Sequence, residues 1–121
     1  SESLAIADSI FDSTQMMINT LVATPIDTYS LSQYRSSKYL IQIDEGTTAT
    51  ARCQVIELLV LATNTGTAHV LEYGSVMSDG DLGDFDVSVT NVLGDVVVTL
   101  YFMAHDTVEK TIKVLRTAMT V

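Results

Sequence analysis

Hydrophobic and polar residues alternate along most of the chain, with turn residues between the alternating stretches. Alternation with a period of two is typical of β-strands that bury one face. It is clearest in residues 38–44, 84–90 and 96–103, and weaker in residues 108–121. The inward positions that it predicts are Tyr39, Ile41, Ile43, Phe85, Val87, Val89, Val96, Val98, Leu100 and Phe102. Repeated short strands with turns between them predict an antiparallel β-sandwich of about seven strands.

Residues 50–76 form the centre of this pattern. They are predicted to be two extended strands joined by the turn Asn64-Thr65-Gly66-Thr67. Residues 55–61 are apolar on both faces except at Glu57, which is typical of a strand covered on both sides. One face is then the core, and the other needs a loop, the N-terminal segment or a second subunit. The predicted assembly surface comprises Ile56, Leu58, Val60, Val97, Tyr101 and Met103.

The N-terminal residues have no clear pattern. Their apolar positions fit a weak helical spacing, while their Ser, Thr, Asp and Asn content fits an extended arm equally well. Pro25, the single proline, marks a break or a strand edge. We therefore expect residues 1–25 to form a short N-terminal arm or docking segment, and residues 26–121 to form the sandwich domain.

Two charged residues share the parity of apolar neighbours. Glu57 alternates in phase with Val55 and Leu59, and Arg116 alternates in phase with Ile112 and Val114. An isolated charge inside a core is costly, so residues of opposite sign in such places tend to pair. One hypothesis is a buried structural ion pair between Glu57 and Arg116. The alternative is that a bulge turns one or both side chains to water.

Composition narrows the classes of function. The formal net charge of −9, with six Lys and Arg scattered along the chain, argues against binding to nucleic acid. No apolar run approaches the length of a membrane span, so no membrane partner is expected. A hydrophobic content of 47% and a mean hydropathy of +0.31 favour a homo-oligomer that buries apolar surface. Cys53 is expected to be a small buried hydrophobe.

Candidate chemistry is sparse. Four carboxylates in one loop, those of Asp79, Asp81, Asp84 and Asp86, make calcium conceivable, although their spacing differs from an EF-hand loop and a solvated turn is the simpler interpretation. His69 and His105 have no metal-ligand spacing and no catalytic-triad context. The five tyrosines could stack on sugars or fill the core. We expect no cofactor and no enzymatic activity.

Six short runs follow one another along residues 26–117. They are Ile26-Asp27-Thr28-Tyr29-Ser30, Tyr34-Arg35-Ser36-Ser37-Lys38-Tyr39, Glu57-Leu58-Leu59-Val60, Glu72-Tyr73-Gly74, Leu82-Gly83-Asp84-Phe85-Asp86 and Lys113-Val114-Leu115-Arg116-Thr117. Together these runs resemble a domain that recurs in virion structural proteins of tailed phages infecting marine cyanobacteria. Their order and spacing carry the resemblance over residues 26–121. It implies a non-enzymatic building block of the particle and supplies no catalytic residues.

The sequence thus predicts a virion protein that assembles with copies of itself and with other virion proteins. Tail, neck, fibre and head decoration are all possible places for it. The alternatives are a glycan-binding module and a calcium-dependent adhesion module for attachment to a host surface. An exposed cluster of tyrosines would favour glycan binding, whereas a broad apolar surface would favour assembly.

Overall fold

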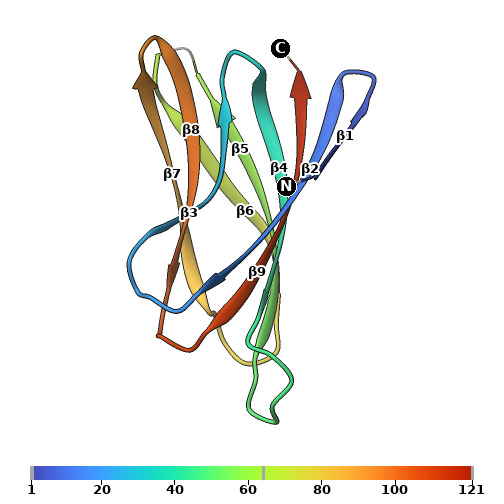
Figure 1. The fold of residues 1–121 in the computed structure, drawn as a ribbon, viewed down its shortest axis with the longest axis vertical. Coiled ribbons are helices and arrows are strands. Elements are labelled where there is room, and N and C mark those ends of the chain that lie inside the picture. Colours follow the sequence, from blue (N-terminus) through green and yellow to red (C-terminus); the bar gives the residue numbers. More distant parts are fainter. Residues whose placement is uncertain (1, 64, 121) are drawn as a thin grey trace.

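The computed structural model describes residues 2–63 and 65–120, which form nine antiparallel strands in two sheets (Figure 1). The strands are β1 (Glu2–Ile6), β2 (Ser9–Ile18), β3 (Thr24–Ser30), β4 (Tyr34–Asp44), β5 (Cys53–Ala62), β6 (Ala68–Met77), β7 (Gly83–Val92), β8 (Asp95–Ala104) and β9 (Lys110–Thr120). Sheet A has the order β1-β2-β9-β4-β5-β6, and sheet B has the order β3-β8-β7. The predicted antiparallel β-sandwich is confirmed, with two strands more than expected.

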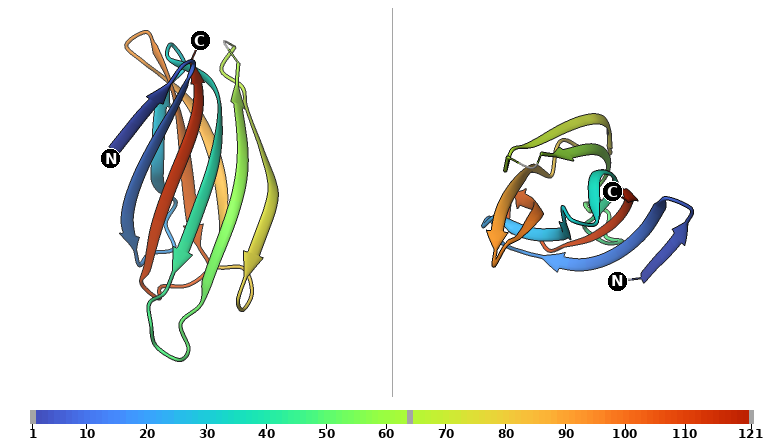
Figure 2. Two further views of the ribbon diagram at one scale, coloured as in Figure 1. Left: turned by 90° about the vertical axis from the view of Figure 1, so that its right-hand side faces the viewer. Right: turned by 90° about the horizontal axis from the view of Figure 1, so that it is seen from above.

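The two sheets face each other and enclose one core (Figure 2). All ten inward positions predicted from the alternation point to this core; the residues from β4 and β8 are fully buried except Val96, and those from β7 are partly buried. β-Branched and aromatic residues dominate these positions because they pack well on a pleated surface. Sheet A has twice as many strands as sheet B, so β1 and much of β6, at its two edges, have no opposing strand, whereas β2 lies opposite β3.

The central hairpin is confirmed as β5 and β6, although Asn64 of its turn lies outside the described residues. The face predicted for β5 is wrong. Ile56, Leu58 and Val60 were expected on the assembly surface but are at most 2% exposed, whereas their neighbours on the strand reach water. Because β5 is apolar on both faces, its own alternation could not decide which side is the core.

The inward face of β5 includes a buried amide. Gln54 is 2% exposed, and its Nε2 donates to Ser75 Oγ at 3.0 Å and to Asp81 Oδ1 at 2.9 Å. Its Oε1 accepts from the backbone N–H of Leu82 at 2.8 Å. A buried polar group is tolerated when its hydrogen bonds are satisfied in this way. Cys53, on the opposite parity, is exposed and not buried as expected.

The N-terminal residues are part of the sheet. β2 pairs with β9 over ten residues, from Ser9–Met119 to Ile18–Lys110, and Ile18 is buried in the core. The expected boundary at residue 25 therefore does not coincide with a break in the fold. Every second residue of β2, from Ile10 to Ile18, faces inward, and this alternation was obscured by the polar members Asp12 and Thr14. Only β1 fits the description of an arm, since it pairs with β2 alone (Figure 2).

Candidate functional site

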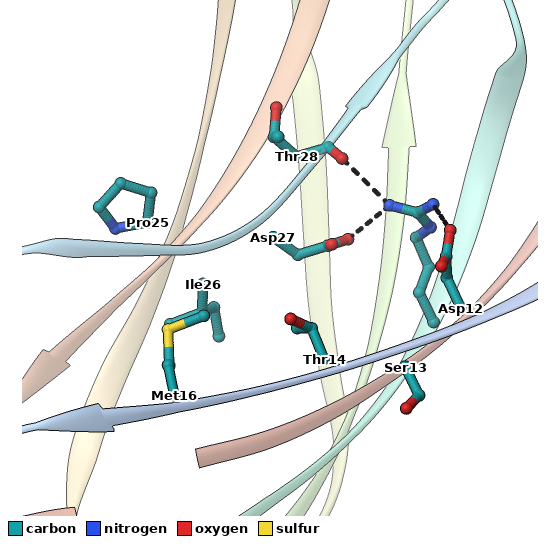
Figure 3. A pocket seen from close by; sticks show the side chains of 9 residues that line it. Asp12, Ser13, Thr14, Met16, Pro25, Ile26, Asp27 and Thr28 are labelled. Carbon is teal, nitrogen blue, oxygen red and sulfur yellow. Dashed lines mark hydrogen bonds and ion pairs between the residues drawn. The ribbon is translucent and has the colours of Figure 1, made fainter. Parts of the chain in front are cut away.

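Arg116 is the most heavily engaged polar residue between the two sheets. It lies on β9, faces inward and is 5% exposed. Its Nη1 donates to Asp27 Oδ2 at 2.7 Å and to the Thr28 carbonyl oxygen at 3.1 Å, and its Nη2 donates to Asp12 Oδ2 at 2.7 Å (Figure 3). Asp12 belongs to β2 of sheet A, and Asp27 belongs to β3 of sheet B. The guanidinium group therefore joins three strands and bridges the two sheets.

The predicted partner of Arg116 is wrong, although its burial and its pairing with a carboxylate are confirmed. Glu57 lies on β5 with its side chain on the outer face of sheet A, in phase with exposed Val55 and Leu59. This prediction failed for the same reason as the predicted face of β5: the strand is apolar on both sides, so its alternation did not show which side is the core. Asp27 gave no signal because a β-bulge between Pro25 and Asp27 shifts the register of β3. Asp12 could have been found by following the alternation along residues 10–18.

Aromatic rings and a phenol complete the surroundings of Arg116. Its guanidinium carbon lies 5.4 Å from the ring centre of Tyr29 and 5.5 Å from that of Tyr34, within the range of cation–π attraction. The Tyr39 hydroxyl donates to Asp27 Oδ2 at 2.7 Å. Burial, and then the Asp27 carboxylate, raise the pKa of Tyr39 far above its ordinary value. The phenol therefore stays protonated and continues to donate to Asp27.

The charges around Arg116 hold it in its ionised form. Burial alone would lower the pKa of Arg116, but the neighbouring carboxylates of Asp27 and Asp12 outweigh this effect and raise it. Within the described residues, the buried Nε of Arg116 has no hydrogen-bond partner. With both carboxylates paired to one cation, this cluster is suited to clamping the sheets together.

A cleft of about 340 Å³ lies beside this cluster, between β2 and β3 (Figure 3). Its lining comprises Asp12, Ser13, Thr14, Met16, Pro25, Ile26, Asp27, Thr28 and Arg116. None of these nine residues is a His, Cys or Lys. The lining therefore has no imidazole to act as a base and no thiol or amine to act as a nucleophile at neutral pH. The charged members are already paired with each other, which leaves hydroxyl groups and an apolar floor facing the cleft.

The Asp-rich loop does not assemble a metal site. Within residues 2–63 and 65–120, no three His, Cys, Asp or Glu side chains are placed to hold a metal ion. Asp81 binds the amide of Gln54, and Asp84 Oδ2 lies 3.0 Å from His105 Nε2. Asp86 points outward from β7 and accepts from the backbone N–H of Val87. Three of the four predicted calcium ligands thus make separate contacts, and Asp79 makes none of these contacts.

A second ion-pair network ties two loops together at the opposite end from the β7–β8 turn. Lys110, which is fully buried, lies 2.6 Å from Asp106 and 3.3 Å from Glu45. Arg52 contacts the same two carboxylates, at 2.6 Å and 2.7 Å. Hydrogen bonds from Arg52 lower the pKa of Glu45, and those from Lys110 and Arg52 lower the pKa of Asp106. This network fixes the β4–β5 loop against the β8–β9 loop.

The outer face of sheet A is the largest feature that the internal contacts leave unused. Leu40 opposes Leu115, and Leu59 opposes Leu71, so apolar side chains form adjacent pairs across β9, β4, β5 and β6. We call this set the sheet A surface. Its exposed apolar members are Leu40, Val55, Leu59, Leu61, Leu71, Val76, Leu115 and Met119. Glu57 lies in its middle, which leaves this carboxylate beside Lys38 rather than Arg116.

The outer face of sheet B carries the other half of the predicted assembly surface. Val97, Tyr101 and Met103 project outward from β8, as expected, and are half-buried. They are flanked on β7 by Asp84 and Asp86 through the pairs Asp84–Met103 and Asp86–Tyr101. We call this set the sheet B surface.

The tyrosines do not form a surface cluster. Tyr29, Tyr34 and Tyr39 are buried around Arg116. Tyr73 is exposed on sheet A and Tyr101 is half-buried on sheet B, so these two lie on opposite faces of the sandwich. Within the described residues there is also no helix long and apolar enough to span a membrane.

The comparisons with known proteins give one structural likeness. No protein-family model and no curated protein sequence matches this chain. The fold is similar to part of the tailspike protein of Acinetobacter phage vB_ApiP_P1, with a TM-score of 0.51 and 18% sequence identity. The match covers 92% of this chain and 22% of the tailspike chain. At this identity the likeness concerns the fold alone, and the fold is one that a phage tail protein uses.

Proposed function

We propose that this chain is a virion structural protein of a tailed phage, a non-enzymatic building block that acts by self-assembly. The observation that carries the proposal is the sheet A surface, where apolar side chains from four adjacent strands face outward without cover from the chain itself. Exposed apolar patches of this extent mark protein–protein contacts in folded proteins. The fold likeness to a phage tailspike supports the viral context.

The narrower origin, a tailed phage of marine cyanobacteria, rests on the sequence resemblance over residues 26–121. A place in the tail agrees best with the structural likeness, because the protein that shares the fold is a tailspike. The chain corresponds to about a fifth of that protein's length, so it matches one module of a longer polypeptide.

The contrast between tyrosines and apolar residues supports assembly over glycan binding. A sugar-binding surface uses exposed aromatic rings as platforms, and three of the five tyrosines are instead buried around Arg116. The sheet A surface, by contrast, offers Leu and Val side chains on a broad face. The calcium-dependent alternative has no support from the Asp79–Asp86 loop, whose carboxylates make separate contacts.

The experiment is to purify the phage particles that encode this chain and quantify it in them by mass spectrometry. The proposal predicts a fixed number of copies per particle that stays constant through density-gradient purification. Imaging of the same particles with an antibody fragment against the exposed β7–β8 turn would then locate the subunit. Particles that lack the chain, or that lose it on repeated purification, would overturn the proposal.

A further inference from the structure

The Lys and Arg side chains that make no ion pair within the described residues all lie on one sheet. Of its six Lys and Arg residues, Arg52, Lys110 and Arg116 are held in the internal ion pairs described above. The other three are Arg35, Lys38 and Lys113, and no ion pair within residues 2–63 and 65–120 uses them. All three lie on β4 or β9, which are neighbours in sheet A.

Two of these cations flank the apolar centre of the sheet A surface. Lys38 opposes Leu59, Lys113 opposes Gln42, and the pair Leu40–Leu115 lies between them along the strands. Lys113, Leu40 and Leu115 also line a hollow of about 420 Å³ on this face. The surface therefore has an apolar centre with an ammonium group on either side. Its acidic members are Glu57, next to Leu40, and Asp44, at the end of β4.

The sheet B surface has the opposite charge. Strands β3, β7 and β8 contain no Lys or Arg. Its apolar centre, formed by Val97, Tyr101 and Met103, is bordered by the exposed carboxylates of Asp84 and Asp86. The Asp84 side chain is 67% exposed even though it touches His105. This face is also narrow, with three strands against the six of sheet A.

We propose that the sheet A surface of one copy binds the sheet B surface of a second copy. This inference rests on the proposed self-assembly and names the two faces that meet. Apolar centres would then cover each other, and Lys38 and Lys113 would meet Asp84 and Asp86 at a sheet-to-sheet spacing of about 10 Å. Two sheet B surfaces in contact would oppose the Asp84 and Asp86 carboxylates of both copies with no Lys or Arg from strands β3, β7 or β8 between them. Two sheet A surfaces in contact would leave the acidic face and its apolar centre uncovered.

A contact between two different faces has a structural consequence. Such a pair keeps one free sheet B surface on the first copy and one free sheet A surface on the second, so further copies can add in the same way. The product is a closed ring if the rotation between neighbours closes, and an extended stack if it does not. Either form suits a particle component that is present in several copies.

The test uses charge reversal on each face. One variant carries Lys38→Glu and Lys113→Glu, and the other carries Asp84→Lys and Asp86→Lys. The control variant carries Asp79→Lys and Glu109→Lys. These two changes raise the net charge by as much as the second variant does, but they lie in exposed loops. Sedimentation velocity at a series of concentrations gives the association of each protein, and circular dichroism with urea unfolding selects the variants that fold.

We expect each face variant alone to need about a tenfold higher protein concentration for half-association than the wild type, because like charges meet in the contact. The control should associate like the wild type. An equimolar mixture of the two face variants should recover association, since each intact face then meets an intact partner and the two reversed faces match each other. If the variant with Asp84→Lys does not fold, the single variants Asp86→Lys and Lys113→Glu replace the two double variants, and the same measurements are made on them.

The outcomes separate this inference from the proposed function. If the wild type assembles and the sheet B variant assembles equally well, the inference is wrong while self-assembly stands. If the wild type assembles and the equimolar mixture of the two face variants does not regain association, the proposed pairing of these two faces is wrong. If the wild type stays monomeric under all conditions, self-assembly itself fails.

Discussion

At the scale of single residues, Arg116 shows how a charge is kept inside a small sandwich. Two carboxylates, a backbone carbonyl and two aromatic rings surround its guanidinium group. Arginine suits this place because its planar guanidinium group offers donors on separate nitrogen atoms to the two carboxylates and also lies near the aromatic rings, whereas lysine offers one ammonium nitrogen. The same geometry makes the cluster sensitive to the loss of any one member.

Replacing Arg116 with Met should lower the free energy of unfolding by roughly 3–5 kcal/mol, because the carboxylates of Asp27 and Asp12 then keep their charges without a cation beside them. Asp27→Asn should also destabilise, and the double variant should lose less than the sum of the two by roughly 1–3 kcal/mol. Urea unfolding of the four proteins measures this coupling. Glu57→Gln is the control, and it should change the stability by less than about 1 kcal/mol. Additive effects of Arg116 and Asp27 would contradict the clamp.

His105 gives a prediction on pH. Its hydrogen bond to Asp84, together with the Asp81 carbonyl, raises the pKa of His105 above its ordinary value of 6.5. Since the folded-state pKa is higher than the unfolded one, the protonated ring stabilises the fold below the unfolded pKa. That contribution is lost as the pH rises through the folded pKa. An NMR titration should find the raised value in the wild type and a lower one in Asp84→Asn; equal values would show that Asp84 is not the cause.

At the scale of elements, the start of β7 is packed too closely for any side chain. A Cβ atom on Gly83 would lie 2.6 Å from the Met103 carbonyl oxygen and would overlap the ring of Phe102. Gly83→Ala should therefore destabilise by roughly 1–3 kcal/mol, measured by urea unfolding. Gly74→Ala is the matched control, because the nearest atom to its added methyl group is Glu57 Cβ at 3.8 Å, an ordinary contact. Equal stability of the two variants would argue against this tight packing.

The two N-terminal strands should differ in their importance for folding. Removing residues 1–7 takes away all of β1, which pairs only with β2, so cooperative unfolding should persist with a small loss of stability. Removing residues 1–18 also deletes Asp12 and the buried Ile18 and leaves β9 as a sheet edge. The longer deletion should cost more than about 3 kcal/mol or abolish folding. Thermal unfolding by circular dichroism distinguishes these results, and a stable, cooperative 19–121 fragment would contradict them.

The sequence predicts strands well where one face is polar. The faces of β4 and β7 follow directly from alternation, as Ile41 and Val87 show. The face of β8 was also predicted correctly, with Leu100 inward, although both faces of this strand carry apolar residues. β5 could not be oriented because it is apolar on both faces and its inward set includes the polar Gln54. The partners of Arg116 required knowledge of the fold, since Asp12 is 104 residues away in sequence and Asp27 is 89 residues away. Neither the β-bulge in β3 nor a contact between residues far apart in the chain produces a periodic pattern in the sequence.

At the scale of the whole molecule, the sandwich separates what holds it together from what it presents. The ion pairs of Arg116 and Lys110 lie between the sheets or among the loops at one end. The two outer faces carry Lys38, Lys113, Asp84 and Asp86 and most of the exposed Leu and Val side chains. Charged side chains are ordinary at a surface, but broad exposed apolar patches mark protein contacts, so this distribution suits a subunit whose outer faces meet other proteins.

The most direct test of this account is the sedimentation of the isolated protein at micromolar concentration, compared with Leu59→Glu at the centre of the sheet A surface. The control is Leu93→Glu, the same change at the fully exposed tip of the β7–β8 turn. We predict assemblies for the wild type and for Leu93→Glu, and a folded monomer for Leu59→Glu, because a charge on an apolar contact face weakens association. A wild type that stays monomeric, or a Leu59→Glu variant that assembles like the wild type, would contradict the account.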